Sequence, residues 1–218
     1  MPRTATDRRS RFVFGLWLVV AACHRTPPPA AVTPSAALSD LAAQHVIVLP
    51  TFRVRFASEL HWETTVRPRD VQRSLDSAIA KELEARGLTT NWILPEALVQ
   101  SYKRNPTYAT DPYGLAEQPL IYPGLMGAGS RLPEPLASQL RTMIALHGDA
   151  RFIVAPVDFW FDRLESGFAQ PGLIVAVIDA RGSDLRMTAT FRGDTTRTVS
   201  PAVVTSMAVK FANLFMRQ

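Results

Sequence analysis

Three carboxylates at short spacing are the first residues in this chain that could do chemistry. Asp158, Asp162 and Glu165 lie on or just beyond a segment with strand character. Two carboxyl groups in different surroundings can act as a general acid and a general base. That work also needs a shaped pocket, which spacing alone does not provide. We therefore interpret these carboxylates as the solvated end of a strand.

Histidines and hydroxyl nucleophiles give no recognisable catalytic or metal-binding pattern. His61 and Glu63 could form a metal pair, but the alternation of a strand-like segment explains them equally, and zinc sites usually have three or four protein ligands. His147 lies at the end of a predicted helix, where the helix dipole favours a cation. The chain holds no Gly-x-Ser-x-Gly or His-Glu-x-x-His string. We expect no metal, no cofactor and no enzymatic reaction.

A glycine-rich stretch, Gly124 to Gly129, could be taken for a phosphate-binding loop. It lacks the Lys followed by Ser or Thr, and it does not lie between a strand and the helix that such a loop opens. We interpret it as flexible loop. The alternative that remains is an enzyme whose site assembles from residues distant in sequence.

The one cysteine, Cys23, is the residue whose chemistry the sequence explains best. Arginines are frequent among the first eleven residues. Residues 12–22 then form an apolar run of eleven, which is too short for the ~20 residues that span a bilayer. This order is typical of an export signal. A single cysteine in an exported protein cannot form an internal disulfide, so it needs another role.

The segment Val20-Ala21-Ala22-Cys23 resembles the lipobox of bacterial lipoproteins. That resemblance implies cleavage after residue 22 and a lipid on Cys23, which would anchor the chain to a membrane without spanning it. His24 and Arg25 follow the cysteine, where an aspartate would imply retention in the inner membrane. The resemblance therefore implies the periplasmic face of the outer membrane.

Charge does not indicate a nucleic-acid partner. The net charge of +5 includes +3 from the arginines and one aspartate of the signal, and 20 basic and 18 acidic residues remain after it. No basic run with interleaved aromatic residues follows residue 25, so the pattern of a phosphate-backbone binder is missing.

The remaining chain divides into a tether and one globular domain. Residues 23–43 are rich in Pro and Ala, which favours extended polyproline II. Residues 44–218 have the length and the 47% hydrophobic content of one domain.

Periodicity within residues 44–218 predicts an α/β fold. We expect the element order β-α-β-α-α-β-β-β-α and a mixed sheet of about five strands with helices packed on it. The predicted strands cover residues 46–56, 88–94, 150–161, 172–180 and 185–192, and the last two form a hairpin. The predicted helices cover residues 70–86, 96–103, 136–147 and 200–215.

Single residues mark several of these boundaries. Asp70 is a predicted N-cap and Gly87 the residue that follows the same helix. Ser200 and Pro201 start the last helix as N-cap and first residue. Pro156 inside a strand predicts a bulge or an edge position.

A long loop, residues 104–133, is the candidate binding surface. The four tyrosines of the chain, Tyr102, Tyr108, Tyr113 and Tyr122, fall in or beside it. Tyrosine offers a large, rigid, amphipathic contact area, and loops often carry function. The alternative is a loop that its rings pack onto its own domain. We hypothesise that Tyr108, Tyr113 and Tyr122 contact a protein partner.

Several segments together are similar to one group of envelope lipoproteins. They are Val46 to Phe52, Leu83 to Gly87, Gly148 to Val154, and Val177 to Gly182. They resemble the CsgG type, the curli-secretion lipoprotein, whose fold is shared with the TolB amino-terminal domain. The resemblance implies a non-enzymatic domain that assembles with itself or with envelope partners. The alternatives are a lipid-anchored periplasmic enzyme and an oligomeric secretion component. The long loop has no counterpart in the pattern.

Overall fold

The computed structural model describes residues 38–121, 126–148 and 150–216, which form one mixed α/β domain. The predicted mixed α/β fold is confirmed, and the order of elements matches the prediction except for a split first strand and an additional short helix, residues 118–121. The sheet has six strands, where about five were expected, because the predicted first strand is two. The segment from Leu49 to Phe52 is not in strand conformation and separates those two strands. None of the described helices is both long and apolar enough to cross a bilayer.

The elements are bounded as follows. The strands are β1 Val46–Val48, β2 Arg53–Phe56, β3 Trp92–Ile93, β4 Phe152–Arg163, β5 Ala169–Asp179 and β6 Asp184–Arg192. The α-helices are α1 Pro68–Ala85, α2 Pro95–Arg104, α3 Gln118–Ile121, α4 Leu136–Leu146 and α5 Pro201–Asn213. Short 3₁₀ helices cover Ser39–Ala43, Ser58–Leu60, Trp62–Thr64 and Leu88–Thr90.

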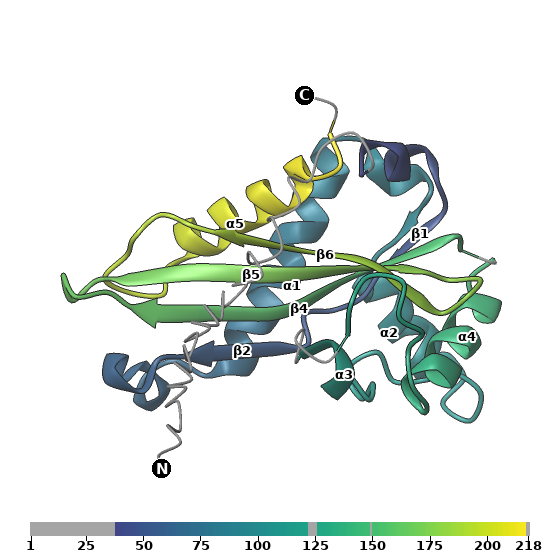
Figure 1. Cartoon of the computed structure of the whole chain (residues 1–218), viewed down its shortest axis with the longest axis horizontal. Coiled ribbons are helices and arrows are strands. Elements are labelled where there is room, and N and C mark those ends of the chain that lie inside the picture. Colours follow the sequence, from purple (N-terminus) through teal and green to yellow (C-terminus); the bar gives the residue numbers. More distant parts are fainter. Residues whose placement is uncertain (1–37, 122–125, 149, 217–218) are drawn as a thin grey trace, which may run out of the picture. The chain divides into compact units, whose positions relative to one another are not determined.

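The strand order is β3-β1-β4-β5-β6 (Figure 1). β3, β1 and β4 are parallel, whereas β5 pairs antiparallel with β4 and β6 pairs antiparallel with β5. β2 also pairs in parallel with β4, on residues that follow those paired with β1. The predicted hairpin of the last two strands is confirmed.

Helix boundaries follow the local signals with one exception. Pro68 begins α1, and Arg67 takes the N-cap position without a side-chain cap, so Asp70 is in the first turn and its prediction as N-cap was wrong. Proline is favoured at the first helical position because its missing N–H has no intrahelical partner there. Gly87 follows α1 at φ 71°, which a glycine adopts without strain, as predicted. Ser200 and Pro201 start α5 as predicted.

A bulge in β4 at Pro156 reverses which side chains face which side of the sheet. Pro156 pairs with Val175 and Asp158 with Ile174, so β4 carries one extra residue, Val157, at this point. The predicted bulge is confirmed, on a central strand. A one-residue slip sends every later side chain to the opposite face. Phe159 therefore faces the side opposite to Val157.

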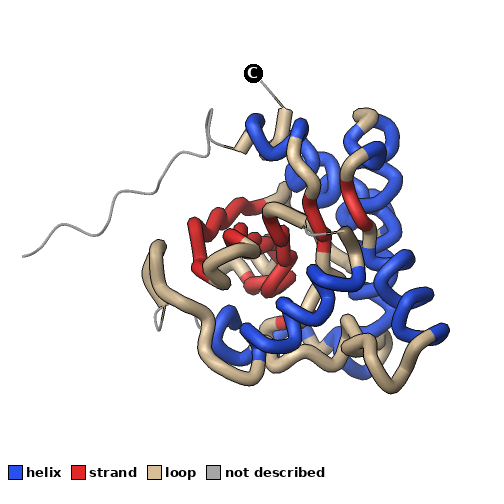
Figure 2. The backbone as a smooth tube through the Cα atoms, turned by 90° about the vertical axis from the view of Figure 1, so that its right-hand side faces the viewer, coloured by secondary structure: helices blue, strands red, loops and turns tan. Residues whose placement is uncertain are grey.

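Each face of the sheet has its own hydrophobic core. The first core lies between the sheet and helices α1 and α5, and includes Leu75, Ile79, Val154, Phe159, Phe161 and Phe211. The second lies under α2, α3 and α4, and includes Ile47, Leu98, Leu120, Leu140, Ile153 and Ile178. Figure 2 shows the helices gathered to the right of the strands and below them, with loops on the left. The faces are thus unequally covered.

Residues 38–43 correct the predicted tether. Leu38 and Leu41 are buried in the first core, and the 3₁₀ helix Ser39–Ala43 carries them. The folded domain therefore includes residues that the sequence assigned to the tether, because two leucines among alanines are enough to bury a short turn. The signal, Cys23 and the earlier part of the tether lie outside the described residues.

The long loop is packed onto the domain over much of its length. Leu115, Leu120, Ile121 and Leu132 are buried in the second core, and α3 forms inside the loop. The packed interpretation is thus right for this part of residues 104–133. Whether the loop also binds a partner is a separate question.

Candidate functional site

Two of the three tyrosines predicted to contact a partner lie among the described residues, and they occupy different settings. Tyr108 is 77% exposed in a turn that follows α2, whereas Tyr113 is 45% exposed and uses its hydroxyl inside the domain. Tyr122 and Cys23 lie outside the described residues. Only Tyr108 presents its ring to solvent without a hydrogen bond that ties it down.

The Tyr113 hydroxyl reaches a buried carboxyl group that the sequence analysis missed. It donates to Asp76 Oδ2 at 3.0 Å, while the backbone N–H and the hydroxyl of Thr51 donate to Asp76 Oδ1 at 2.8 and 2.7 Å. We call Thr51, Asp76 and Tyr113 the tyrosine–carboxyl cluster. It joins the end of β1, the middle of α1 and the long loop, segments far apart in the sequence.

The environment of Asp76 changes its acidity. Burial raises the pKa of this carboxyl to about 6, and the hydrogen bonds from Thr51 and Tyr113 only partly oppose that rise. Burial and the neighbouring Asp76 charge raise the pKa of the Tyr113 hydroxyl well above its ordinary value. At neutral pH Asp76 is therefore mainly ionised and Tyr113 is a firm donor.

Two cavities meet at Tyr113. The first, which we call the recess, has a volume of about 480 Å³ and is lined by Phe52, Arg69, Gln72, Arg73, Asp111 and Tyr113. The second, of about 700 Å³, runs between α1 and the start of α2 and shares Arg73 and Tyr113 with the recess. Both volumes fall in the ~300–1,000 Å³ range of small-molecule sites.

The topology explains why a concave site forms here. β1 leads through α1 to β3 on one side, and the chain returns to β4 on the other side of β1. Open α/β sheets bind ligands outside the carboxyl ends of strands at such a reversal of strand order. Thr51 follows the carboxyl end of β1, and Pro95 at the carboxyl end of β3 lines the second cavity.

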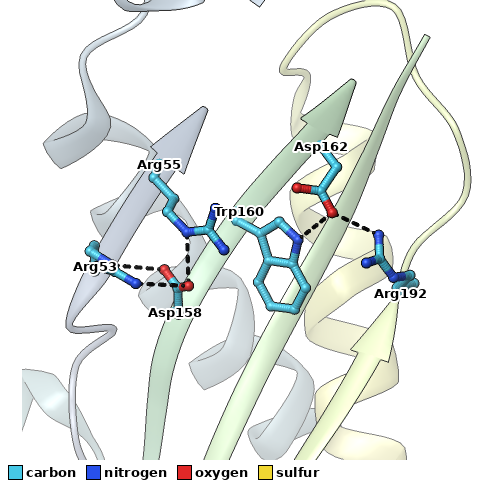
Figure 3. A network of polar contacts seen from close by, with 6 residues as sticks. All are labelled: Arg53, Arg55, Asp158, Trp160, Asp162 and Arg192. Atoms are coloured by element: carbon cyan, nitrogen blue, oxygen red, sulfur yellow. Dashed lines mark hydrogen bonds and ion pairs between the residues drawn. The ribbon is translucent and has the colours of Figure 1, made fainter. Parts of the chain in front are cut away.

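A second polar assembly lies on the sheet face beyond the second core (Figure 3). Asp158 accepts from Arg53 Nε at 3.0 Å and from Arg55 Nε at 2.9 Å, and is 2% exposed. Trp160 Nε1 and Arg192 both donate to Asp162 Oδ2 at 2.9 Å. We call these six residues, Arg53, Arg55, Asp158, Trp160, Asp162 and Arg192, the sheet-face network.

The Trp160 ring holds this network together. The Arg55 and Arg192 guanidinium carbons lie 5.5 and 5.7 Å from its centroid. A guanidinium over an indole face is attracted by the ring quadrupole. The ring also covers Gly172 of β5, where a side chain would collide with it.

The network corrects the interpretation of the three carboxylates as a solvated strand end. Asp158 is buried and accepts hydrogen bonds from two arginines, because the bulge turns it onto the open face beside β2. Asp162 is paired with Arg192, and only Glu165 is exposed and lies in the turn after β4. Asp158 and Asp162 therefore serve as ion-pair partners on the sheet.

The histidines also differ from their predicted settings. His61 lies between two 3₁₀ helices at φ 53°, so the predicted strand alternation was wrong there. His147 is the C-cap residue of α4 as expected, but burial and the neighbouring His45 lower its pKa and oppose the cation that the dipole favours. Within the described part of the chain no three His, Cys, Asp or Glu side chains could hold a metal.

The glycine-rich stretch has a structural role where it is described. Gly129 has φ 85°, and its N–H donates to the Leu185 carbonyl oxygen at 2.6 Å. Arg131 then pairs with Asp184 of β6. These contacts attach the end of the long loop to the last hairpin.

One sequence signal could have identified Asp76. At ~100° per residue, it lies beside Leu83 on the helical wheel, at the edge of the apolar stripe of α1. A carboxylate there predicts a buried polar contact. Its partners, Thr51 and Tyr113, could not be inferred because only the fold brings them together.

Comparisons with known proteins place no family on the chain. No family model matches it, and no curated protein matches it. Among solved structures it is similar to the PelC dodecamer from Paraburkholderia phytofirmans, with 16% identity, a TM-score of 0.39 and coverage of 86% of this chain and 93% of that one. A leucine-to-methionine variant of that dodecamer gives 15% identity, a TM-score of 0.38 and coverage of 80% and 90%. At these values the likeness assigns neither a family nor a function.

Proposed function

We propose that this protein is a membrane-anchored binding or assembly factor of the cell envelope, without catalytic activity. A lipid on Cys23 holds it at the periplasmic face of a membrane, by preference the outer membrane. Its long loop contacts an envelope protein. The observation that carries the proposal is the exposure of Tyr108, the largest among the big hydrophobic side chains of the described residues.

The turn that carries Tyr108 is ordered by its own backbone. The N–H groups of Tyr108 and Ala109 donate to the Asn105 carbonyl oxygen at 3.1 and 2.8 Å. Buried Pro112 and Leu115 fix the chain that follows. A ring held on an ordered turn loses little conformational entropy on binding, which suits a contact residue.

A Tyr108→Ala substitution tests this contact. Truncating an anchoring aromatic side chain at an interface costs ~2 kcal/mol or more, which corresponds to at least a tenfold loss of affinity. We expect Tyr108→Ala to abolish crosslinking of the membrane-extracted protein to its envelope partner. The thermal midpoint should change little, because Tyr108 is 77% exposed.

Leu146→Ala is the matched control. Leu146 is also large and exposed, but it lies at the end of α4. The Leu146→Ala substitution should leave crosslinking intact. Equal crosslinking of the Tyr108 variant and the wild-type protein would contradict the proposal. Removing the whole loop is a poor test, because it would take Leu115, Leu120 and Ile121 out of the second core.

Self-association remains within the proposal, since the resemblance to CsgG-type lipoproteins implies assembly with itself or with other proteins. Crosslinks between copies, rather than to a different protein, would identify that form. The Tyr108 substitution tests both forms in the same way.

A second candidate, a lipid-anchored enzyme, is favoured by one observation. Asp76 has a raised pKa and borders a cavity formed by residues distant in sequence, as many catalytic carboxylates do. However, both of its oxygens already accept hydrogen bonds, from Thr51 and Tyr113, which suits a structural carboxylate better than a free base.

A further inference from the structure

We propose that the recess beside Tyr113 binds a small hydroxylated organic anion, whose carboxylate is held by Arg69 and Arg73. This inference goes beyond the proposed function, which concerns a protein partner at Tyr108. It assigns a separate ligand site to α1 and the inner part of the loop.

The two arginines of the recess have no ion pair among the described residues. Arg69 and Arg73 lie four residues apart on α1, so they share one face of the helix. Neither arginine side chain forms an ion pair or a hydrogen bond with another described residue. Most other arginines of the described part are engaged, for example Arg53 and Arg192 in the sheet-face network. Two free guanidiniums in a recess match the paired oxygens of a carboxylate or phosphate.

The remaining lining residues define the rest of the ligand. Phe52 and Tyr113 contribute aromatic rings, so part of the wall suits a carbon skeleton. Gln72 and Asp111 contribute an amide and a carboxylate, which can bond to hydroxyl groups. The Asp111 charge also disfavours a second negative charge on the ligand. This combination fits a hydroxylated monoanion, such as a sugar acid, better than inorganic phosphate.

The recess is held in shape before any ligand enters. The Gln72 amide donates to the Thr51 carbonyl oxygen, and the Tyr113 hydroxyl is fixed on Asp76. Asp111 Oδ1 accepts from the Tyr113 backbone N–H at 3.0 Å. Three of the six lining residues therefore have defined positions, and preorganisation of this kind lowers the cost of binding.

Calorimetric titration of the wild-type protein with glucuronate, glucose and inorganic phosphate tests the site. Glucuronate and glucose differ in the carboxylate that the arginines are expected to hold, whereas phosphate tests charge without a carbon skeleton. We expect glucuronate to bind at least tenfold more tightly than either comparison ligand. Binding of phosphate as tight as that of glucuronate, or equal binding of glucose, would overturn the proposal.

Arginine variants locate the binding. Arg69→Gln and Arg73→Gln should each weaken glucuronate binding about tenfold. Arg67→Gln is the control, because it removes the same charge from the start of the same helix, where Arg67 is 87% exposed and paired with Asp70. It should bind glucuronate as the wild-type protein does.

Equal weakening in all three variants would show that only net charge matters, and it would overturn the site. Unchanged thermal midpoints confirm that the variants are folded, as expected for exposed residues. The Tyr108→Ala variant should still bind glucuronate. An experiment that contradicts ligand binding in the recess can therefore be distinguished from one that contradicts the protein-binding proposal.

Discussion

At the scale of single residues, Asp76 is the group whose protonation matters most to the fold. Its pKa of about 6 in the folded protein exceeds the ordinary value of 3.8. Between those values the folded state binds more protons than the unfolded state, so the free energy of unfolding falls as pH rises. The stabilisation from this group is complete below pH 3.8 and is lost as pH rises through about 6.

An Asp76→Asn substitution should remove this pH dependence. Two pKa units correspond to about 3 kcal/mol, at about 1.4 kcal/mol per unit. The amide keeps an oxygen that can accept from Thr51 and gains a donor for the Tyr113 oxygen, so the fold should persist. Urea unfolding at pH 4 and pH 7 should show a wild-type loss of stability that is reduced by roughly this amount in the variant.

Asp70→Asn is the control for that measurement, since Asp70 is an exposed carboxylate on the same helix. It should keep the wild-type dependence on pH between 4 and 7. If the Asp76→Asn variant also kept the wild-type pH dependence of stability, the raised pKa assigned to Asp76 would be wrong.

Residue-level prediction from the sequence was limited to features that neighbouring residues determine. The sequence placed Tyr108 and Tyr113 in one loop with one hypothesised role, whereas in the structure Tyr108 is 77% exposed and the Tyr113 hydroxyl is hydrogen-bonded to Asp76. Asp158 was misplaced because its burial depends on a bulge and on two arginines about a hundred residues away. Local sequence carries no information about such partners.

At the scale of elements, the bulge at Pro156 determines what each face of the sheet offers. If the same residues formed a regular strand without the bulge, Phe159 and Phe161 would lie on the face of Ile153, and Trp160 would point into the first core. With it, the aromatic residues fill the first core and Trp160 joins the charged face. The network of Figure 3 is thus a consequence of one proline in a strand.

A Gly172→Ala substitution tests the packing of Trp160 on β5. The added Cβ would collide with the indole ring, so the ring must move away from Arg55 and Arg192. Overpacking of this kind typically costs about 1–3 kcal/mol. We expect that loss in the free energy of unfolding, measured in urea, with a change in tryptophan fluorescence of the native state.

The comparison is Gly127→Ala, where an added Cβ meets no atom within 4 Å. It should change stability by less than about 0.5 kcal/mol. Unfolding of the Gly172 variant at the same urea concentration as the Gly127 variant would show that Trp160 does not lie over β5 as described.

Elements with strong local signals could be predicted, and elements defined by pairing could not. The periodicity of α1 and the turn between β5 and β6 were enough to identify these elements. The break between β1 and β2 was missed, although Pro50, which has no N–H to donate to a strand ladder, lies within it. The chain rejoins β4 at the bulge, where the Phe52 N–H donates to the Pro156 carbonyl oxygen.

At the scale of the whole molecule, the two faces of the sheet carry different structural features. The first core is closed by α1 and α5, and Leu38 and Leu41 fasten the start of the domain to it. The opposite face carries the long loop and the sheet-face network, and the recess lies where α1 meets the loop.

Metabolic labelling with a fatty acid tests the central claim, that the domain works at a membrane surface through a lipid on Cys23. Cells that express the wild-type chain or Cys23→Ser receive a labelled fatty acid, and both proteins are recovered by affinity purification. We predict label on the wild-type protein in the membrane fraction and none on the Cys23→Ser protein. A wild-type protein as free of label as the Cys23→Ser protein would contradict the account.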